Sequence, residues 1–223
     1  MNDIVARLCS VKKYFGRTLI LDNINLTLEK GEIVGLLGPN GSGKTTIMKL
    51  LAGMLSPSEG TISRANSYRS LIEEPRFYPS LSGYDNLLYF ACLSGKGKTD
   101  VDCVVEQLRL NKYIKKRVKK YSLGMRQKLG IAYTLLSDAE LLILDEPMNG
   151  LDPFSVVEVR TLLQRLAKER GTTVLLSSHI LSEMQKVCDR VIFLKEGRIL
   201  SENPVSDSVD LEELYVSYFR EEE

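Results

Sequence analysis

The sequence predicts an α/β fold in which helices cover both faces of a mainly parallel β-sheet, with antiparallel strands added at the N-terminus and a group of helices inserted. Three apolar runs, "EIVGLLG", "LLILDEP" and "TTVLLSS", are typical of strands that are buried on both faces. Segments with helical periodicity separate these runs, and strands that alternate with helices favour a parallel sheet.

Composition and charge limit the class of protein. The chain has 223 residues, of which 43% are hydrophobic and 26% are charged, so it can bury one sizeable core. Its 30 basic and 29 acidic residues give a net charge of +1, which offers no reason to expect a polyanionic partner. No apolar run reaches the ~18 residues expected of a membrane-spanning helix. The four cysteines form no CxxC pair, so we expect reduced thiols.

The N-terminal part of the chain predicts strands, a glycine-rich loop and a helix. Residues 4–15 and 18–28 alternate apolar and polar side chains, and residues 32–38 form the first buried strand. After the glycine-rich loop, apolar residues recur at helical spacing until the segment "SPSEG". These residues are Ile47, Leu50, Leu51 and Met54.

The middle of the chain, from about residue 68 to residue 137, predicts mainly helices. Apolar stripes lie in residues 83–95, 99–110 and 122–136. The third stripe can present one apolar face made of Leu129, Ala132, Tyr133 and Leu136.

The final third of the chain alternates strand and helix. Between the buried strands "LLILDEP" and "TTVLLSS", a helix is delimited by Asp152 as N-cap, Pro153 at the first helical position and Gly171 after the last turn. Residues 189–200 predict a hairpin around "KEG", and a short acidic amphipathic helix is expected from Asp207 onward.

The stretch "GPNGSGKT", residues 38–45, fits the phosphate-binding pattern GxxxxGK(S/T). Its glycines allow backbone N–H groups to point inward around a phosphate, and the positive end of the following helix favours the same anion. Lys44 can reach the outer phosphates, and the Thr45 hydroxyl can bind Mg²⁺. A glycine-rich turn with a chance lysine would not explain the strand before the loop and the helix after it.

Two adjacent carboxylates end the buried strand "LLILDEP". Asp145 is placed to hold Mg²⁺, and Glu146 projects toward the phosphates as the candidate base for an attacking water. The alternative is an acid that caps a helix before Pro147, but a charge beside a buried strand needs a cation.

His179 is the one histidine, and it follows the buried strand "TVLLSS". Ligands of such sheets bind at the carboxyl ends of the strands, where Lys44 and Asp145 are also expected. We therefore predict that His179 contacts the terminal phosphate, the alternative being an ordinary, partly buried histidine.

These motifs resemble the nucleotide-binding subunit of an ATP-binding cassette (ABC) transporter over nearly the whole chain. The phosphate loop resembles the Walker A motif, residues 141–146 the Walker B strand with its glutamate, "NGLD" at 149–152 the D-loop, and His179 the switch histidine. The resemblance implies a P-loop NTPase core and one ABC ATP-binding domain over residues 1–223, with a helical signature subdomain inserted at about residues 73–137.

The resemblance also implies which residues act on ATP. Glu146, His179 and Lys44 are the expected catalytic residues, and Thr45, Asp145 and Glu73 are the expected Mg²⁺ ligands. The expected contacts to the nucleotide within these motifs are Gly38, Pro39, Asn40, Gly41, Ser42, Gly43, Lys44, Thr45, Thr46 and Asp152.

The stretch "YSLGMRQKLGIA" resembles the family signature, usually written LSGGQ. The resemblance implies that two subunits pack head to tail, so that Ser122 and Gly124 of one subunit close on the ATP held by the other. Leu123 and Met125 replace the usual glycine and glutamine, and the added bulk of Leu123 is expected to loosen or slow this closure. The hydroxyl, the second glycine and the helix start are kept.

A second departure lies in "LIEEPRFYP", where Glu73 stands in the place of the family's usual glutamine near Mg²⁺. A glutamate can bind Mg²⁺ directly as a hard oxygen donor, but it also adds negative charge near the phosphates. Both departures resemble the exporter subunits for bacitracin or lantibiotic self-protection.

An aromatic residue near the N-terminus usually stacks on adenine in this family. The spacing to Gly38 favours Phe15, and strand alternation leaves Tyr14 as the alternative. A core or surface aromatic without a ligand is the remaining interpretation.

A basic run precedes the signature. Such a run is usually a solvated face, which we expect here, with acidic lipid headgroups as the second possibility. Its members are Lys112, Lys115, Lys116, Arg117, Lys119 and Lys120.

We therefore expect an ATP-hydrolysing subunit, peripheral to the membrane on its cytoplasmic face, that powers export through a separate transmembrane permease. Residues 76–86 are expected to contact that permease, and a second copy of the chain or a related ATPase subunit completes the dimer. No nucleic acid is expected. The alternatives are a soluble cassette ATPase acting on DNA or ribosomes, and a kinase with the same phosphate loop, which leaves "YSLGM" and "NGLD" unexplained.

Overall fold

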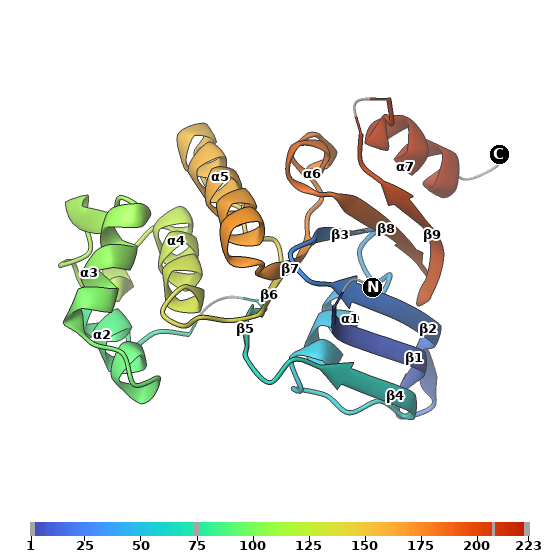
Figure 1. Ribbon diagram of the computed structural model, residues 1–223, viewed down its shortest axis with the longest axis horizontal. Helices are drawn as coiled ribbons and strands as arrows, with labels where there is room; N and C mark the ends of the chain where they lie inside the picture. The colour runs from blue at the N-terminus through green and yellow to red at the C-terminus, as the bar shows by residue number, and fades with distance from the viewer. Residues whose placement is uncertain (1–2, 74–75, 207, 221–223) are drawn as a thin grey trace.

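The computed structural model describes residues 3–73, 76–206 and 208–220, and within these ranges its strands form two sheets (Figure 1). The larger sheet has six strands in the order β5-β6-β7-β3-β8-β9, and all neighbours are parallel except the antiparallel pair β8 and β9. Its strands are β3 (Ile33–Leu37), β5 (Tyr68–Leu71), β6 (Leu141–Leu144), β7 (Thr173–Ser177), β8 (Arg190–Lys195) and β9 (Arg198–Pro204).

The large sheet separates two apolar cores, as expected of strands that are apolar throughout. Val34 and Leu36 of β3 point into a core shared with helix α1 (Lys44–Leu51) and the smaller sheet. Ile33 and Leu37 point to the opposite face, into the core formed with the remaining helices. The alternation places each residue of the strand in one core or the other, which confirms the predicted mainly parallel α/β core.

The smaller sheet is antiparallel and has the strand order β2-β1-β4. Strands β1 (Ile4–Phe15) and β2 (Thr18–Glu29) confirm the predicted N-terminal strands. Strand β4 (Glu59–Arg64) pairs with β1 and was not predicted, because its pattern is too polar to indicate a strand without its partner.

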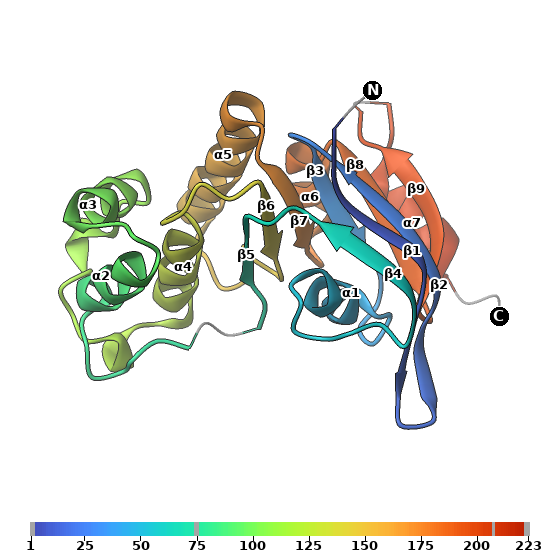
Figure 2. The same cartoon turned by 60° about the horizontal axis from the view of Figure 1, so that its bottom comes forward.

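The helical group lies beyond the edge strand β5, and helix α5 stands between this group and the C-terminal elements (Figures 1 and 2). The elements of the helical group are α2 (Gly83–Leu93), α3 (Lys98–Gln107), the short turns η1 (Leu110–Lys112) and η2 (Val118–Lys120), and α4 (Leu123–Thr134). The helices that follow are α5 (Pro153–Arg170), α6 (Leu181–Val187) and α7 (Leu211–Phe219). Asp207, where the last helix was expected to begin, lies outside the described residues.

Three expectations about the helices were wrong. Residues 68–71 form the edge strand β5 instead of helix, because pairing with β6 outweighs the weak local pattern of "YRSL". Helix α1 ends at Leu51, and Gly53 follows with a positive φ of 67°, so Met54 lies beyond the helix and is 56% exposed. Leu136 lies beyond the end of α4, although it is buried.

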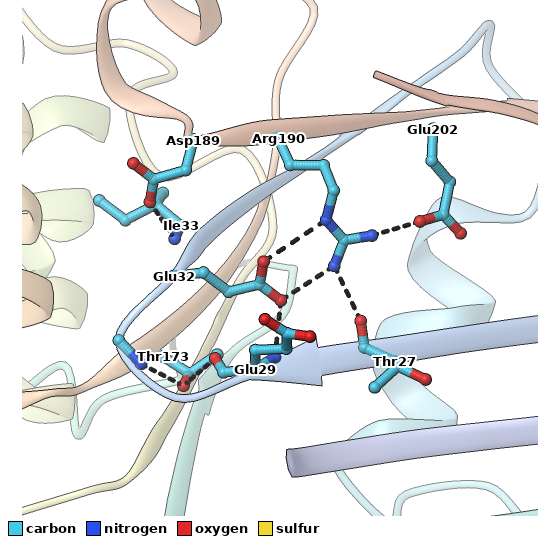
Figure 3. A network of polar contacts seen from close by, with 9 residues as sticks. Thr27, Glu29, Glu32, Ile33, Thr173, Asp189, Arg190 and Glu202 are labelled. Carbon is cyan, nitrogen blue, oxygen red and sulfur yellow. Dashed lines mark hydrogen bonds and ion pairs between the residues drawn. The ribbon is translucent and has the colours of Figure 1, made fainter. Parts of the chain in front are cut away.

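A network of polar contacts joins the two sheets at the end where the parallel strands begin (Figure 3). The Arg190 guanidinium donates to the carboxylate of Glu32 (2.9 Å), to that of Glu202, and to the carbonyl of Thr27 (2.8 Å). Beside it, the Asp189 carboxylate accepts a hydrogen bond of 2.8 Å from the backbone N–H of Ile33. These contacts fix the approach of β2 to β3 and therefore the start of the strand that leads to the phosphate loop.

Among the residues that the structure describes, no helix is both long enough and apolar enough to cross a membrane.

Candidate ATP-binding site

The phosphate loop joins the end of β3 to the start of α1, as the pattern predicts. Its glycines are required by close packing: a Cβ on Gly38 would lie 2.2 Å from the Leu194 carbonyl, and one on Gly43 would lie 2.6 Å from Leu21 Cδ2. Both residues have positive φ, 153° and 109°. The loop therefore exposes its backbone at the positive end of α1, which is the arrangement that binds phosphate.

Two side chains of this loop are held in its interior. The Lys44 ammonium donates hydrogen bonds to the carbonyls of Gly38 (2.6 Å) and Pro39 (3.0 Å). The Ser42 hydroxyl is buried, and no residue that the structure describes offers it a hydrogen-bond partner. A buried, unpaired hydroxyl is costly, so Ser42 indicates a polar ligand at this loop.

The Asp145 carboxylate lies at the end of β6, next to the phosphate loop. Its Oδ2 accepts a hydrogen bond of 2.9 Å from the Thr45 hydroxyl, and its Oδ1 accepts one of 2.6 Å from the Ser177 hydroxyl at the end of β7. Three elements far apart in the sequence thus meet at the carboxyl ends of β3, β6 and β7, where open α/β sheets bind their ligands.

Glu146 is held in a backbone conformation that is rare for a residue with a side chain, with φ of +49°. Its backbone N–H donates to the Ser177 hydroxyl (2.9 Å), and its carbonyl accepts from the Gln127 amide of α4 (3.1 Å). Its carboxylate Oε2 lies 2.8 Å from His179 Nδ1. Such a strained conformation, fixed on several sides, is found at functional sites.

The site combines opposite charges in a partly buried setting. Burial lowers the pKa of Lys44, and the negative charges of Glu146 and Asp145 oppose that shift. The two carboxylates are thus close enough to Lys44 to stabilise its positive charge against the effect of burial.

Two residues of this site were missed in the sequence. Ser177 bridges Asp145 and Glu146, and Gln127 contacts the Glu146 carbonyl from the signature helix. A polar residue directly at the end of the buried strand "TVLLSS" was the available signal for Ser177. Gln127 offered no signal, because it sits within a helix pattern and only the packing of α4 brings it to Glu146.

Apart from Gln127, the signature segment does not join this cluster within the chain: its start, Ser122 to Gly124, lies elsewhere. Ser122 caps α4, since its hydroxyl accepts a hydrogen bond of 3.2 Å from the Met125 N–H. In both views β5 and β6 lie between α4 and α1, which follows the phosphate loop (Figures 1 and 2). Gly124 instead approaches the D-loop, where a Cβ would lie 2.5 Å from the Gly150 carbonyl.

Asp152 of the D-loop is the N-cap of α5, as predicted. Its carboxylate accepts hydrogen bonds from the Ser155 N–H (3.1 Å) and from the Ser155 hydroxyl (2.6 Å). These hydrogen bonds lower the pKa of Asp152, and the one from the Ser155 hydroxyl has the larger effect. Within the chain, the Asp152 side chain therefore stabilises the start of α5.

Glu73 is tied to α1. Its carboxylate lies 2.5 Å from the Lys49 ammonium, one helical turn after Thr45, and this contact lowers the pKa of Glu73. It forms no hydrogen bond to Thr45 or Asp145 among the described residues. The lysine offsets the extra negative charge that a glutamate brings to this position.

The two candidate aromatics at the N-terminus differ in exposure. The Phe15 ring is 49% exposed and lies 5.2 Å from the Lys13 ammonium, whereas Tyr14 is half-buried. The exposed ring is the one available for stacking.

The fold and the site together define a P-loop ATPase cassette: a phosphate loop, an acidic pair at the end of the neighbouring strand, and a helical group that carries a separate capped helix. A family model described as ABC transporter matches residues 21–149. The chain belongs to the ABC transporter family and is an ATP-binding subunit that hydrolyses ATP to power transport.

Relatives and solved structures agree with this assignment. SrtF, a lantibiotic transport ATP-binding protein of Streptococcus pyogenes, is 41% identical over 215 residues, which cover 92% of this chain and 93% of the relative. BcrA, a bacitracin transport ATP-binding protein of Enterococcus faecalis, is 41% identical over 89% of this chain and 68% of its own length. A solved ATP-binding subunit of an ABC transporter has a TM-score of 0.87 at 26% identity, covering 96% of this chain and 98% of that structure.

The comparisons confirm the predicted family, fold class and ATPase activity. Because these relatives are transport proteins, they do not favour the alternatives of a cassette acting on DNA or ribosomes or of a kinase.

Proposed function

We propose that the chain binds ATP with Mg²⁺ and hydrolyses it to drive export of an antimicrobial peptide through a separate transmembrane permease, at the cytoplasmic face of the cell membrane. The observation that carries the proposal is the polar cluster around Asp145 and Glu146. It joins the phosphate loop to the ends of β6 and β7 through Thr45 and Ser177. The lantibiotic and bacitracin transport relatives support the cargo class. The two departures that resemble exporter subunits, at Leu123 and Glu73, support the direction.

The donor set fits Mg²⁺, which prefers oxygen ligands and is held by one or two protein groups together with nucleotide phosphates. The Thr45 hydroxyl and the Asp145 carboxylate, 2.9 Å apart, are the residues that would hold it. The ion would neutralise charge on the phosphates. Lys49 lies one helical turn after Thr45 on α1 and holds the Glu73 carboxylate, so we assign Glu73 to a supporting contact of this site.

The chain's own residues account for the remaining chemistry. Lys44 and the glycine-rich loop bind the phosphates, with the buried Ser42 hydroxyl as a further donor. Glu146 accepts the proton of the attacking water, and His179 orients the Glu146 carboxylate and reaches toward the terminal phosphate. Phe15 supplies the ring that stacks on adenine, because it is the more exposed aromatic.

A second subunit completes the site. Ser122 and Gly124 lie at the start of α4, away from the phosphate loop of their own chain, and a helix start is an anion site. A head-to-tail pair of copies, or of this chain with a related subunit, would bring the signature of each to the ATP of the other. The permease would contact the surface of residues 76–86.

The test compares Glu146→Gln with Glu169→Gln, an exposed change on α5. Loss of the base should lower hydrolysis by about two to four orders of magnitude, leave ATP binding intact, and trap an ATP-bound dimer in sedimentation. Glu169→Gln should match the unaltered protein. Full hydrolysis by Glu146→Gln would remove Glu146 from its assigned role.

A further inference from the structure

The segment that joins α3 to α4 concentrates positive charge. The sequence contains no Asp or Glu between Glu106 and Asp138, although the whole chain is nearly neutral, with a net charge of +1. Within this interval seven basic side chains are exposed. Arg109 pairs with Glu158, and the other six form no ion pair or hydrogen bond with another described residue. We call them the basic platform: Lys112, Lys115, Lys116, Arg117, Lys119 and Lys120.

Apolar anchors fix which way these side chains point. Ile114 and Val118 alternate with the cations and are only 3% and 4% exposed, packed in the core of the helical group. Tyr121, at the end of the segment, is 4% exposed. Since the apolar residues point inward, the cations between them are turned to solvent.

The backbone of the platform is also held in place, because it pairs with the segment before α2 and with the first turn of α2. The N–H groups of Val118 and Lys119 donate 3.0 Å hydrogen bonds to the carbonyls of Leu81 and Pro79. The N–H of Tyr84 donates to the carbonyl of Ile114 (2.9 Å). The cations are therefore presented on a fixed surface, whereas an ordinary solvated charge run needs no such support.

Exposed apolar and aromatic side chains lie next to the cations. Leu81, whose carbonyl pairs with Val118, is 38% exposed, and Tyr78 is 47% exposed. The Tyr78 ring packs edge-on against Tyr89 of α2, with ring centroids 5.3 Å apart. Leu81 and Tyr78 both belong to the surface of residues 76–86 that we assign to the permease, so the cations border that surface.

We propose that the basic platform binds anionic phospholipid headgroups, so that this face of the helical group rests on the membrane surface beside the permease. Cations without carboxylate partners complement a negative surface. Figure 2 shows that the helical group carrying the platform lies at the opposite end of the molecule from β1 and β2. The inference rests on the proposed place of the chain at a membrane, but it does not depend on ATP hydrolysis.

The experiment measures co-sedimentation of the purified chain with lipid vesicles, without nucleotide or permease. One set of vesicles is phosphatidylcholine, and the other contains equal parts of phosphatidylcholine and phosphatidylglycerol. The platform variant is Lys115→Gln/Lys116→Gln/Lys119→Gln. The control, Arg17→Gln/Arg165→Gln/Lys168→Gln, removes the same number of exposed charges elsewhere.

Each basic residue at an anionic surface raises binding about fivefold, so the platform variant should lose on the order of a hundredfold in binding to the anionic vesicles. The control variant should lose far less. Binding should also vanish in high salt and be absent on phosphatidylcholine alone. Both variants should keep the unaltered ATPase rate and melting temperature, which separates failure of this inference from failure of the ATPase assignment.

Three results would overturn the inference. One is equal loss in both variants, which would indicate a response to net charge alone. Another is binding to a DNA duplex as tight as binding to the anionic vesicles at the same salt concentration. The third is loss of permease binding by the platform variant in detergent without lipid, which would assign the surface to a protein partner.

Discussion

The side chain of Leu123 rests on Gly150. A Cβ built on Gly150 would lie 2.8 Å from Leu123 Cδ2 and 3.0 Å from its Cγ. The signature and the D-loop therefore touch within one chain, and the residue that departs from the usual signature glycine is accommodated by a glycine in the D-loop.

This contact predicts a coupled mutational effect. Gly150→Ala should destabilise the protein by about 2–3 kcal/mol, because it adds overlap with Leu123 to the cost of a side chain at positive φ. Adding Leu123→Ala to the Gly150→Ala variant should remove the steric overlap. Only the free-energy cost of a side chain at positive φ should then remain. Urea unfolding of the two single variants and the double variant measures the coupling.

Gly95 provides the matched control for this cycle. It has the same φ of 71° as Gly150, but no atom lies within 4 Å of the Cβ position. Gly95→Ala should therefore cost only about 1 kcal/mol. If Gly150→Ala and Leu123→Ala proved additive, the contact would have no energetic role.

The 2.8 Å contact between His179 Nδ1 and Glu146 Oε2 predicts a role in turnover. His179→Ala should lower kcat about a hundredfold, since a misplaced base loses its geometry, while the KM for ATP changes little. Steady-state ATPase kinetics test this split. The control is Ser182→Ala, an exposed change on the neighbouring helix α6, which should leave both constants unchanged. A His179→Ala variant that raised only the KM for ATP would contradict the assignment.

Tyr121 predicts a loss of stability at alkaline pH. Burial raises the pKa of Tyr121 from 10.0 to about 12, and its hydroxyl donates to the carbonyls of Tyr113 (3.1 Å) and Ile114 (3.3 Å). A raised pKa means that the folded chain keeps its proton after the unfolded chain has lost it. The stability from the neutral hydroxyl is thus complete below pH 10 and is lost as the pH rises toward about 12, by about 2 kcal/mol.

The comparison of unaltered protein with Tyr121→Phe isolates this effect. The variant should be less stable by about 1 kcal/mol at neutral pH, from the lost hydrogen bond, and the difference should shrink and reverse between pH 10 and 12. Tyr215→Phe on α7 reports the loss of a tyrosine hydroxyl elsewhere. Parallel pH curves for all three proteins would show that Tyr121 does not titrate differently in the folded state.

The Arg190 network predicts an asymmetry between two arginines. Arg190→Leu leaves the carboxylates of Glu32 and Glu202 without their cation in a partly buried place, and should cost about 2 kcal/mol. Arg198 pairs with Asp22 but is 68% exposed, so Arg198→Leu should cost less than about 1 kcal/mol. Unfolding in urea compares the two, and equal costs would refute the proposed joining role of Arg190.

The elements that could be predicted from sequence are those whose signal is local. The phosphate loop is a run of eight residues between a buried strand and a helix, and the backbone conformation of its glycines follows from that short stretch. Asp152, Pro153 and Gly171 bound α5 for the same reason. The strand β5, in contrast, exists because β6 lies beside it, and the four residues of "YRSL" carry no pattern of their own.

The same distinction between local and tertiary signals applies to the residues of the site. The sequence by itself determined that Lys44, Thr45, Asp145 and Glu146 end or follow buried strands, because periodicity and glycine spacing act over a few residues. Only the tertiary structure decided which residues of the site and its surroundings make contact. Ser177 bridges Asp145 and Glu146, Lys49 holds Glu73, and Leu123 contacts Gly150. Those pairs join segments up to 32 residues apart in the chain. Their distances are set by the order of strands in the sheet and by how α4 packs on it, and no local pattern encodes that order.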